Sequence, residues 1–317
     1  MLPNTGGAFF MQLKDAIEEF LLELDIRGNS KETIRSYSNA LKVFKEYMCD
    51  NTNLDNIKAI HIKEFAKFNK NRGLKQKTQN GYISSIRALY TYLVDEEIVS
   101  KNLGYSVKLV NATDKKEIEV FTKEEIKRLV QHQRGFNEKK SPFLVIRDTL
   151  IINFLLETGC RNHELTNLKY EDIQEGYIFF KVTKNSKPRV VPISKKLKKL
   201  MMRYERIKEE HFRKNKTQEN MKDYYFLSRN GNQLHTVNVG QVVKRACKDL
   251  GISEHKAYAH NFRHTFSVNM LKNTKDIYLV SKLLGHCNVS ITEEYLKGLT
   301  KTDIIDMAKG YSILDNL

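Results

Sequence analysis

The chain has 317 residues, 40% of them hydrophobic, which is enough for two domains with cores of their own. A net charge of +16 indicates a polyanionic partner, and four scattered cysteines without a CxxC pair argue against a disulfide-rich secreted protein. No apolar run approaches the roughly 20 residues of a membrane span and no secretory signal is present, so we expect a cytoplasmic protein that binds no membrane.

Residues 11–105 carry hydrophobic side chains at helical spacing throughout. Four such runs follow one another, and they include Leu13, Ile34, Ile60 and Tyr82. We therefore expect four or five short helices that form a small bundle with aromatic residues in its core. Basic side chains on these helices are candidate contacts to DNA phosphates, although ordinary surface residues look the same. The candidates are Lys31, Arg35, Lys75, Lys77 and Arg87.

A polar, unpatterned segment at 106–118 predicts a linker between two domains. Thr122 and Glu125 then form a capping box that opens the second domain, which we place at 119–299. The first domain carries a net charge of +2 and the chain beyond it +14, so the basic excess lies with the second domain. Residues 1–10 do not fit the pattern that follows, and we interpret them as a tag or a disordered leader.

The second domain is predicted to be mostly helical with one small antiparallel β-sheet. An apolar helix ends at Gly159, and the next helix begins at about Arg161, where open backbone amides favour an anion. Glu164, one turn on, supplies a carboxylate that can hold a cation in place. Segments 177–182 and 189–193 then predict the two strands of a hairpin. A long basic helix follows the hairpin.

His260, Arg263 and His264 share one face of a later helix, since they stand at positions i, i+3 and i+4. An arginine offers permanently charged, bidentate donors, and a histidine titrates near neutral pH. The spacing of the two histidines also suits zinc. Neither an HExxH motif nor a nearby cysteine pair supports a metal site, so we predict none.

Three further groups follow this helix. A second helix over 277–284 ends directly before His286. Ser290 and Glu293 form a capping box for a short third helix, which carries Tyr295. Imidazoles and a guanidinium are thus expected near a phenol, and that grouping suits chemistry on a phosphate because a tyrosine assisted in losing its proton is a nucleophile.

These boxes resemble the tyrosine recombinases, the family of integrases and Xer-type recombinases. They read Thr-Gly-x-Arg-x-x-Glu-Leu, His-x-x-Arg-His and Leu-Leu-Gly-His, followed by Tyr nine residues on, in the family's order. The resemblance implies a two-domain DNA clamp in which the first domain is the core-binding domain. It implies that Arg161 and Arg263 grip the scissile phosphate, that Glu164 supports them, and that Tyr295 is the nucleophile.

The resemblance also assigns the proton transfers. His260 is our choice for moving the proton of Tyr295, and His286 for donating to a non-bridging phosphate oxygen. The family keeps a lysine on the hairpin that protonates the leaving 5′-oxygen. Lys184 matches that lysine best, and Lys187 is the rival because turn lengths slip.

The implied reaction forms a 3′-phosphotyrosine, which a 5′-hydroxyl reverses, so no metal, ATP or other cofactor is expected. The implied partners are double-stranded DNA with inverted repeats and three further copies of the chain, joined in a homotetramer around a Holliday junction. An accessory directionality factor and a location at the nucleoid fit the same reading. Integration or excision of a mobile element and Xer-like resolution stay open.

Two other functions compete with recombination. A type IB topoisomerase shares the chemistry, but the bundle, the linker and the tail argue against it. A DNA-binding protein with a decayed site is disfavoured because both arginines and the tyrosine are present. The tail, residues 300–317, keeps hydrophobic side chains at helical spacing. It packs either on its own domain or, as the resemblance favours, on the next protomer.

Overall fold

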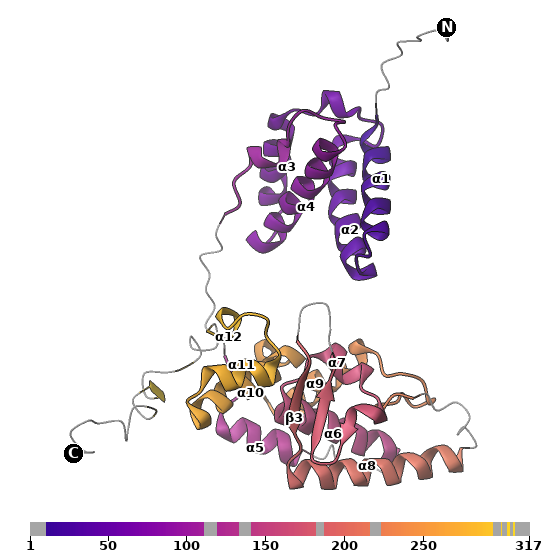
Figure 1. Ribbon diagram of the computed structural model, residues 1–317, viewed down its shortest axis with the longest axis vertical. Helices are drawn as coiled ribbons and strands as arrows, with labels where there is room; N and C mark the ends of the chain where they lie inside the picture. Colours follow the sequence, from indigo (N-terminus) through magenta and orange to yellow (C-terminus); the bar gives the residue numbers. More distant parts are fainter. Residues whose placement is uncertain are drawn as a thin grey trace, which may run out of the picture. The chain divides into compact units, whose positions relative to one another are not determined.

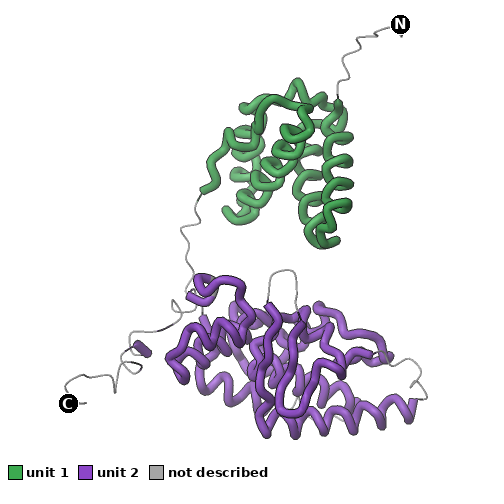
Figure 2. Tube along the Cα trace, viewed as in Figure 1, with its two compact units in different colours: residues 1–115 green, residues 116–317 purple. Residues whose placement is uncertain are grey.

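The computed structural model describes residues 11–110, 119–132, 141–181, 187–215 and 223–293, together with residues 299, 303, 304 and 307. The chain divides into two compact units, residues 1–115 and 116–317 (Figure 2). Each unit has a hydrophobic core of its own, as expected. In the described residues, no helix combines the length and the apolar character that a membrane span requires. The predicted leader, residues 1–10, lies outside the described residues.

The first unit is a helical bundle, as the hydrophobic spacing predicts. Ser30 caps the second helix, because its hydroxyl accepts a hydrogen bond from the Thr33 N–H at 3.2 Å. Phe44 and Phe65 meet in the core with 5.1 Å between ring centroids, whereas Phe68 is 41% exposed and lies outside it. The four helices are α1 (Leu13–Ile26), α2 (Lys31–Met48), α3 (Ala59–Asn71) and α4 (Gln76–Asp95) (Figure 1).

Arg87 of α4 holds the end of this unit in place. Its Nε and Nη2 donate to the carbonyls of Gly104 and Val107, at 3.2 and 2.6 Å. Residues 106–110, which the sequence assigns to the linker, therefore belong structurally with the first unit. The rest of the predicted linker, 111–118, lies outside the described residues.

The second unit is built around the helix α6, which is mostly apolar and has buried side chains along most of its length. Helices α5, α8, α9 and α10 all contact it (Figure 1). The short helices α11 and α12 follow α10 along the chain. The α-helices of this unit are α5 (Lys123–Gln131), α6 (Pro142–Thr158), α7 (Asn162–Asn167), α8 (Lys195–Lys214), α9 (Thr236–Asp249), α10 (Ala259–Thr274), α11 (Ile277–Leu284) and α12 (Ser290–Glu293).

A three-stranded antiparallel sheet lies among these helices, in the order β1 (Ile173–Gln174), β2 (Tyr177–Phe180) and β3 (Arg189–Pro192). Phe180 is paired with Arg189 in the register of β2 and β3. Side chains alternate between a buried and an exposed face, and Arg189 is on the buried one. Strands β2 and β3 are each shorter than the predicted segments 177–182 and 189–193.

The predicted start of the short helix α12 needs correction. Ser290 is the first residue of α12, not the cap before it, and its N–H donates to the side chain of Asn288 at 3.0 Å. The predicted basic helix is α8, which buries Leu197, Met201 and Tyr204, and Lys208 is fully buried with them.

The described part of the tail contacts its own unit. Asp303 forms an ion pair of 2.8 Å with Lys272 of α10. Leu299 and Met307 pack against the cluster that α10 and α11 form. These contacts favour packing in cis as far as Met307, whereas the prediction is that the whole tail, residues 300–317, docks on the next protomer.

Candidate active site

The turn between α6 and α7 places Arg161. Gly159 ends α6 in the left-handed conformation, with φ of +57°, and a methyl group there would lie 2.4 Å from the ring of Phe266. Glycine is therefore required at this turn on two grounds, its backbone conformation and its close packing. The chain then enters α7 with Arg161 as its cap, as predicted.

Glu164 binds Arg161 twice. It accepts the Arg161 backbone N–H at 2.7 Å and the Arg161 Nη1 at 3.1 Å. The same carboxylate receives both Nη atoms of Arg189, at 2.9 and 2.6 Å. Burial by itself would raise the pKa of Glu164, but the bonds and charge of Arg189 and then those of Arg161 outweigh it and lower the pKa to about 2. Glu164 is therefore ionised at neutral pH and shared between two guanidiniums.

Arg263 joins the second and third motif boxes to the first. Its side chain is buried, and its Nη1 donates to the carbonyl of Gly159 at 2.9 Å. Its Nη2 donates to the carbonyl of Leu284 at 2.7 Å and lies 3.0 Å from Nε2 of His286. Segments more than 100 positions apart along the chain thus meet at one guanidinium.

His286 is held on both sides of its ring. Nδ1 lies 2.7 Å from the hydroxyl of Thr292, and Nε2 faces Arg263. Burial, and then the charges of Arg263 and Arg161, lower the pKa of His286 to about 4, so the ring is neutral at pH 7. A neutral ring that accepts from Arg263 carries its proton on Nδ1. The predicted donation from Nε2 to a phosphate oxygen therefore requires the contact with Arg263 to open and a proton to be carried on Nε2.

His260 and His264 lie edge to face, with 4.5 Å between their ring centroids. Burial, followed by the charge of Arg263, lowers the pKa of His260. Burial, then the neighbouring His260, lowers the pKa of His264 to about 4. A neutral His260 suits a proton acceptor. Within the described part of the chain, no group of three or more His, Cys, Asp or Glu side chains could hold a metal ion.

The phage integrase family matches residues 119–301, and the SAM-like N-terminal domain of phage integrases matches residues 17–97. The chain belongs to the phage integrase family. Among the relatives of this integrase-family chain, the tyrosine recombinase XerD of Oceanobacillus iheyensis is 29% identical over 94% of this chain and 98% of its own. The tyrosine recombinase XerA of Pyrococcus horikoshii is 31% identical over 93% and 94%.

Solved structures of recombinases share the fold of this integrase-family protein. The XerH site-specific recombinase, bound to a palindromic difH substrate in a post-cleavage complex, superposes with a TM-score of 0.74. The match has 20% sequence identity and covers 98% of each chain. A DNA-bound integrase of the transposon Tn1549 gives a TM-score of 0.69 with 19% identity, over 95% of this chain and 100% of its own.

Two predicted residues, Lys184 and Tyr295, lie outside the described residues. The rival lysine, Lys187, is described: its side chain is exposed, and its N–H donates to the carbonyl of Gly285 at 3.1 Å. The base of the hairpin thus touches the turn that presents His286. The assignment between the two lysines stays a prediction.

The five candidate DNA contacts of the first unit fall into two kinds. The Arg87 guanidinium is engaged with backbone carbonyls, which gives it a structural role. The other four side chains are exposed and stay predicted DNA contacts. They are Lys31, Arg35, Lys75 and Lys77.

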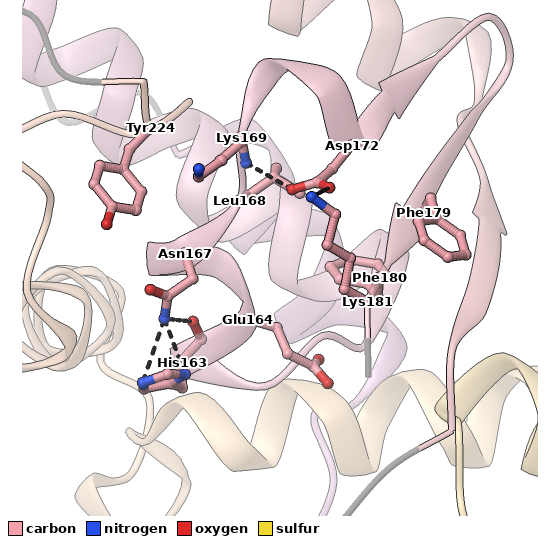
Figure 3. Close-up of a pocket in the computed structure, with 10 residues that line it drawn as sticks. All are labelled: His163, Glu164, Asn167, Leu168, Lys169, Asp172, Phe179, Phe180, Lys181 and Tyr224. Carbon is pink, nitrogen blue, oxygen red and sulfur yellow. Dashed lines mark hydrogen bonds and ion pairs between the residues drawn. The ribbon is translucent and has the colours of Figure 1, made fainter. Parts of the chain in front are cut away.

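A pocket of about 300 Å³ lies beside Glu164, between α7 and β2 (Figure 3). Lys181 lines it, but this ammonium is paired with Glu171 at 2.5 Å and Asp172 at 3.0 Å. Glu164 and its neighbour His163 line the pocket, but Arg161, Arg263 and His286 do not. We therefore take the cluster around Arg161 and Arg263, and not this pocket, as the candidate reaction centre.

Sequence reasoning missed Arg189 and Thr292, which hold Glu164 and His286. A signal for Arg189 existed, because it stands at an inward position of a strand, where an unpaired charge is costly. Thr292 had no such signal.

Proposed function

We propose that this chain is a site-specific tyrosine recombinase that cleaves DNA through Tyr295 and rejoins it to a partner duplex. The observation that carries the proposal is the meeting of the three motif boxes at Arg263, whose Nη atoms reach Gly159, Leu284 and His286. A site assembled in this way from distant segments argues against a decayed DNA-binding protein.

The described groups supply charge for the phosphoryl transfer. Arg161 and Arg263 are permanently charged and would stabilise the pentavalent phosphate by charge-assisted hydrogen bonds. Two guanidiniums do the work that metal ions do in many phosphoryl-transfer enzymes. Because a tyrosine is only roughly 0.1% ionised at pH 7, the site also has to accept a proton. His260, with its lowered pKa, is the group we assign to that step.

The remaining steps follow from the chemistry of the adduct. Lys184 would protonate the 5′-oxygen that leaves when the 3′-phosphotyrosine forms, and a 5′-hydroxyl would later displace Tyr295. The phosphodiester energy is kept in the adduct, so neither ATP nor a metal is required. Cleavage should therefore continue in excess EDTA, and a loss of activity that magnesium or zinc restores would contradict this.

A nicked suicide substrate tests the nucleophile, because the cleaved strand diffuses away and the covalent adduct accumulates. The native chain should form the adduct, and Tyr295→Phe should abolish it while DNA affinity stays within about twofold. Tyr177→Phe is the matched control, since this tyrosine begins β2 and is 41% exposed. An adduct that persists in Tyr295→Phe would refute the assignment.

Assembly and role are the finer parts of the proposal. We infer a homotetramer on paired DNA sites with inverted repeats, and the Xer names of the relatives support Xer-like resolution over integration. Truncation after Met307 keeps the described cis contacts of the tail. It should weaken tetramers in native gels without lowering the melting temperature. Normal tetramers from the truncated chain would exclude docking of the last residues in trans.

A further inference from the structure

Arg189 lies at the junction of three segments that build the site. It is the first residue of β3, and its side chain is 1% exposed. Both Nη atoms bind the carboxylate of Glu164, and the guanidinium lies 4.3 Å from the ring centroid of Phe180. A fork of two parallel bonds fixes the orientation of the carboxylate as well as its position.

The fixed carboxylate of Glu164 in turn fixes the position of Arg161. Its Oε1 accepts Nη1 of Arg189 and Nη1 of Arg161, at 2.9 and 3.1 Å. Its Oε2 accepts the backbone N–H of Arg161. The side chain of Arg161 keeps 30% of its surface exposed, whereas that of Glu164 keeps 3%. Arg189 therefore holds the buried partner of the guanidinium that remains open to a ligand.

The other side of Arg189 faces the turn before His286. A methyl group on Gly285 would lie 3.1 Å from Cδ of Arg189 and 2.8 Å from the carbonyl of Lys187. Gly285 also has φ of +66°, so only glycine fits this turn without strain. The backbone of Lys187 donates to Gly285, which ties the strand to the turn.

We propose that Arg189 is a positioning residue for strand cleavage, which orients Arg161 through Glu164 and supports the turn that presents His286. The inference rests on the proposed recombinase function. Arg189 does not itself reach the phosphate, because its guanidinium is buried against Glu164 and Phe180. Lysine keeps the charge at this position but lacks the planar fork, so it cannot hold both carboxylate oxygens in the same way.

The test is the single-turnover cleavage rate on the nicked suicide substrate at saturating protein. Arg189→Lys should cleave roughly 10- to 100-fold more slowly than the native chain, since small displacements of a catalytic group have effects of that size. Its DNA affinity should stay within about twofold. Arg147→Lys is the matched control: Arg147 is also buried and paired with a carboxylate, Asp148 at 2.7 Å, but lies outside the site. It should lower the melting temperature and keep the native rate.

A double-mutant cycle then tests the route through Glu164. Glu164→Gln and Arg189→Gln should each slow cleavage, and the double variant should be no slower than the slower single one. The double variant removes the carboxylate and the guanidinium of this pair together, so it leaves no unpaired carboxylate. It therefore controls for a loss of activity that is caused by unfolding. A native rate in Arg189→Lys, or additive losses in the cycle, would overturn the proposal. If the native chain forms no adduct at all, the recombinase function itself fails and the role of Arg189 falls with it.

Discussion

Two of the places where the second unit buries positive charge neutralise it in different ways. At the site, Arg161 and Arg189 share the carboxylate of Glu164. In α8, the ammonium of Lys208 lies among three tyrosine rings, with centroids at 4.6, 4.7 and 4.9 Å. Those rings belong to Tyr170, Tyr204 and Tyr225, and we call them the tyrosine cage.

The two arrangements differ in what they leave for a ligand. Lys208 is fully buried, and its Nζ donates to the hydroxyl of Tyr170 and, at 3.1 Å, to the carbonyl of Tyr225. Cation–π contacts and two hydrogen bonds satisfy the ammonium inside the fold. Arg161, by contrast, shares its carboxylate with a second cation and keeps 30% of its side chain exposed. The tyrosine cage keeps the charge of Lys208 away from a ligand, whereas two cations on one carboxylate leave positive charge for an anion.

Removing each cation in turn should separate the two roles. Arg161→Ala should slow single-turnover cleavage about 100- to 1000-fold, the usual effect of losing one preorganised donor to a developing charge. Lys208→Met should cleave at the native rate, because the charge of Lys208 is enclosed in the tyrosine cage. Equal losses of rate in the two variants would show that the tyrosine cage also supports catalysis.

Low pH should reveal how much the ionised carboxylate of Glu164 contributes to the free energy of unfolding. The pKa of this carboxyl is lowered to about 2 in the folded protein, so its stabilising contribution is complete above about pH 4.5 and is lost as the pH falls towards 2. The free energy of unfolding of the native chain minus that of Glu164→Gln should shrink over this window, by an amount on the order of 3 kcal/mol. Urea denaturation from pH 7 to pH 2 measures it. A difference that does not change with pH would show that the carboxylate is not held by the two arginines.

High pH should reveal the effect of Lys208 in the tyrosine cage on the stability of the fold. Burial lowers the pKa of Lys208 to about 8, and the charges of Glu205 and Glu209 offset only part of that effect. Between pH 8 and about 10.5 the unfolded chain then binds more protons at this lysine than the folded one. Native stability should therefore rise relative to Lys208→Met over that window, by roughly 1–3 kcal/mol. A difference that falls with pH would mean that the rings hold the ammonium more strongly than its burial disfavours it.

The first unit also has one basic side chain open to a ligand and one engaged within the fold, and the expected effects are smaller. Lys75 is exposed, whereas the Arg87 guanidinium is engaged with two carbonyls. Lys75→Ala should weaken DNA binding about uniformly across sequences and reduce the salt slope by about 1. Arg87→Ala should lower the melting temperature of the chain instead. A change in salt slope with Arg87→Ala would place its guanidinium on DNA.

Local patterns determined much of this protein. Hydrophobic spacing predicts the four helices of the first unit, and Gly159 and Gly285 end α6 and α11 where the sequence places those ends. The i, i+3 spacing puts His260 and Arg263 on one helical turn. These features depend on neighbours within a few residues, so a single sequence contains the information for them.

Tertiary structure decided which charges are shared and which are open. Nothing in the pattern of α8 shows that Lys208 would be buried, because the rings around it come from positions as distant as Tyr170. Nothing near Glu164 shows that Arg189 would reach it from a strand 25 residues on. The engagement of both nitrogens of His286 likewise depends on how α10 and α12 pack beside it. The physical reason is that burial and ion pairing depend on distances across the fold, whereas helix periodicity and capping depend on distances along the chain.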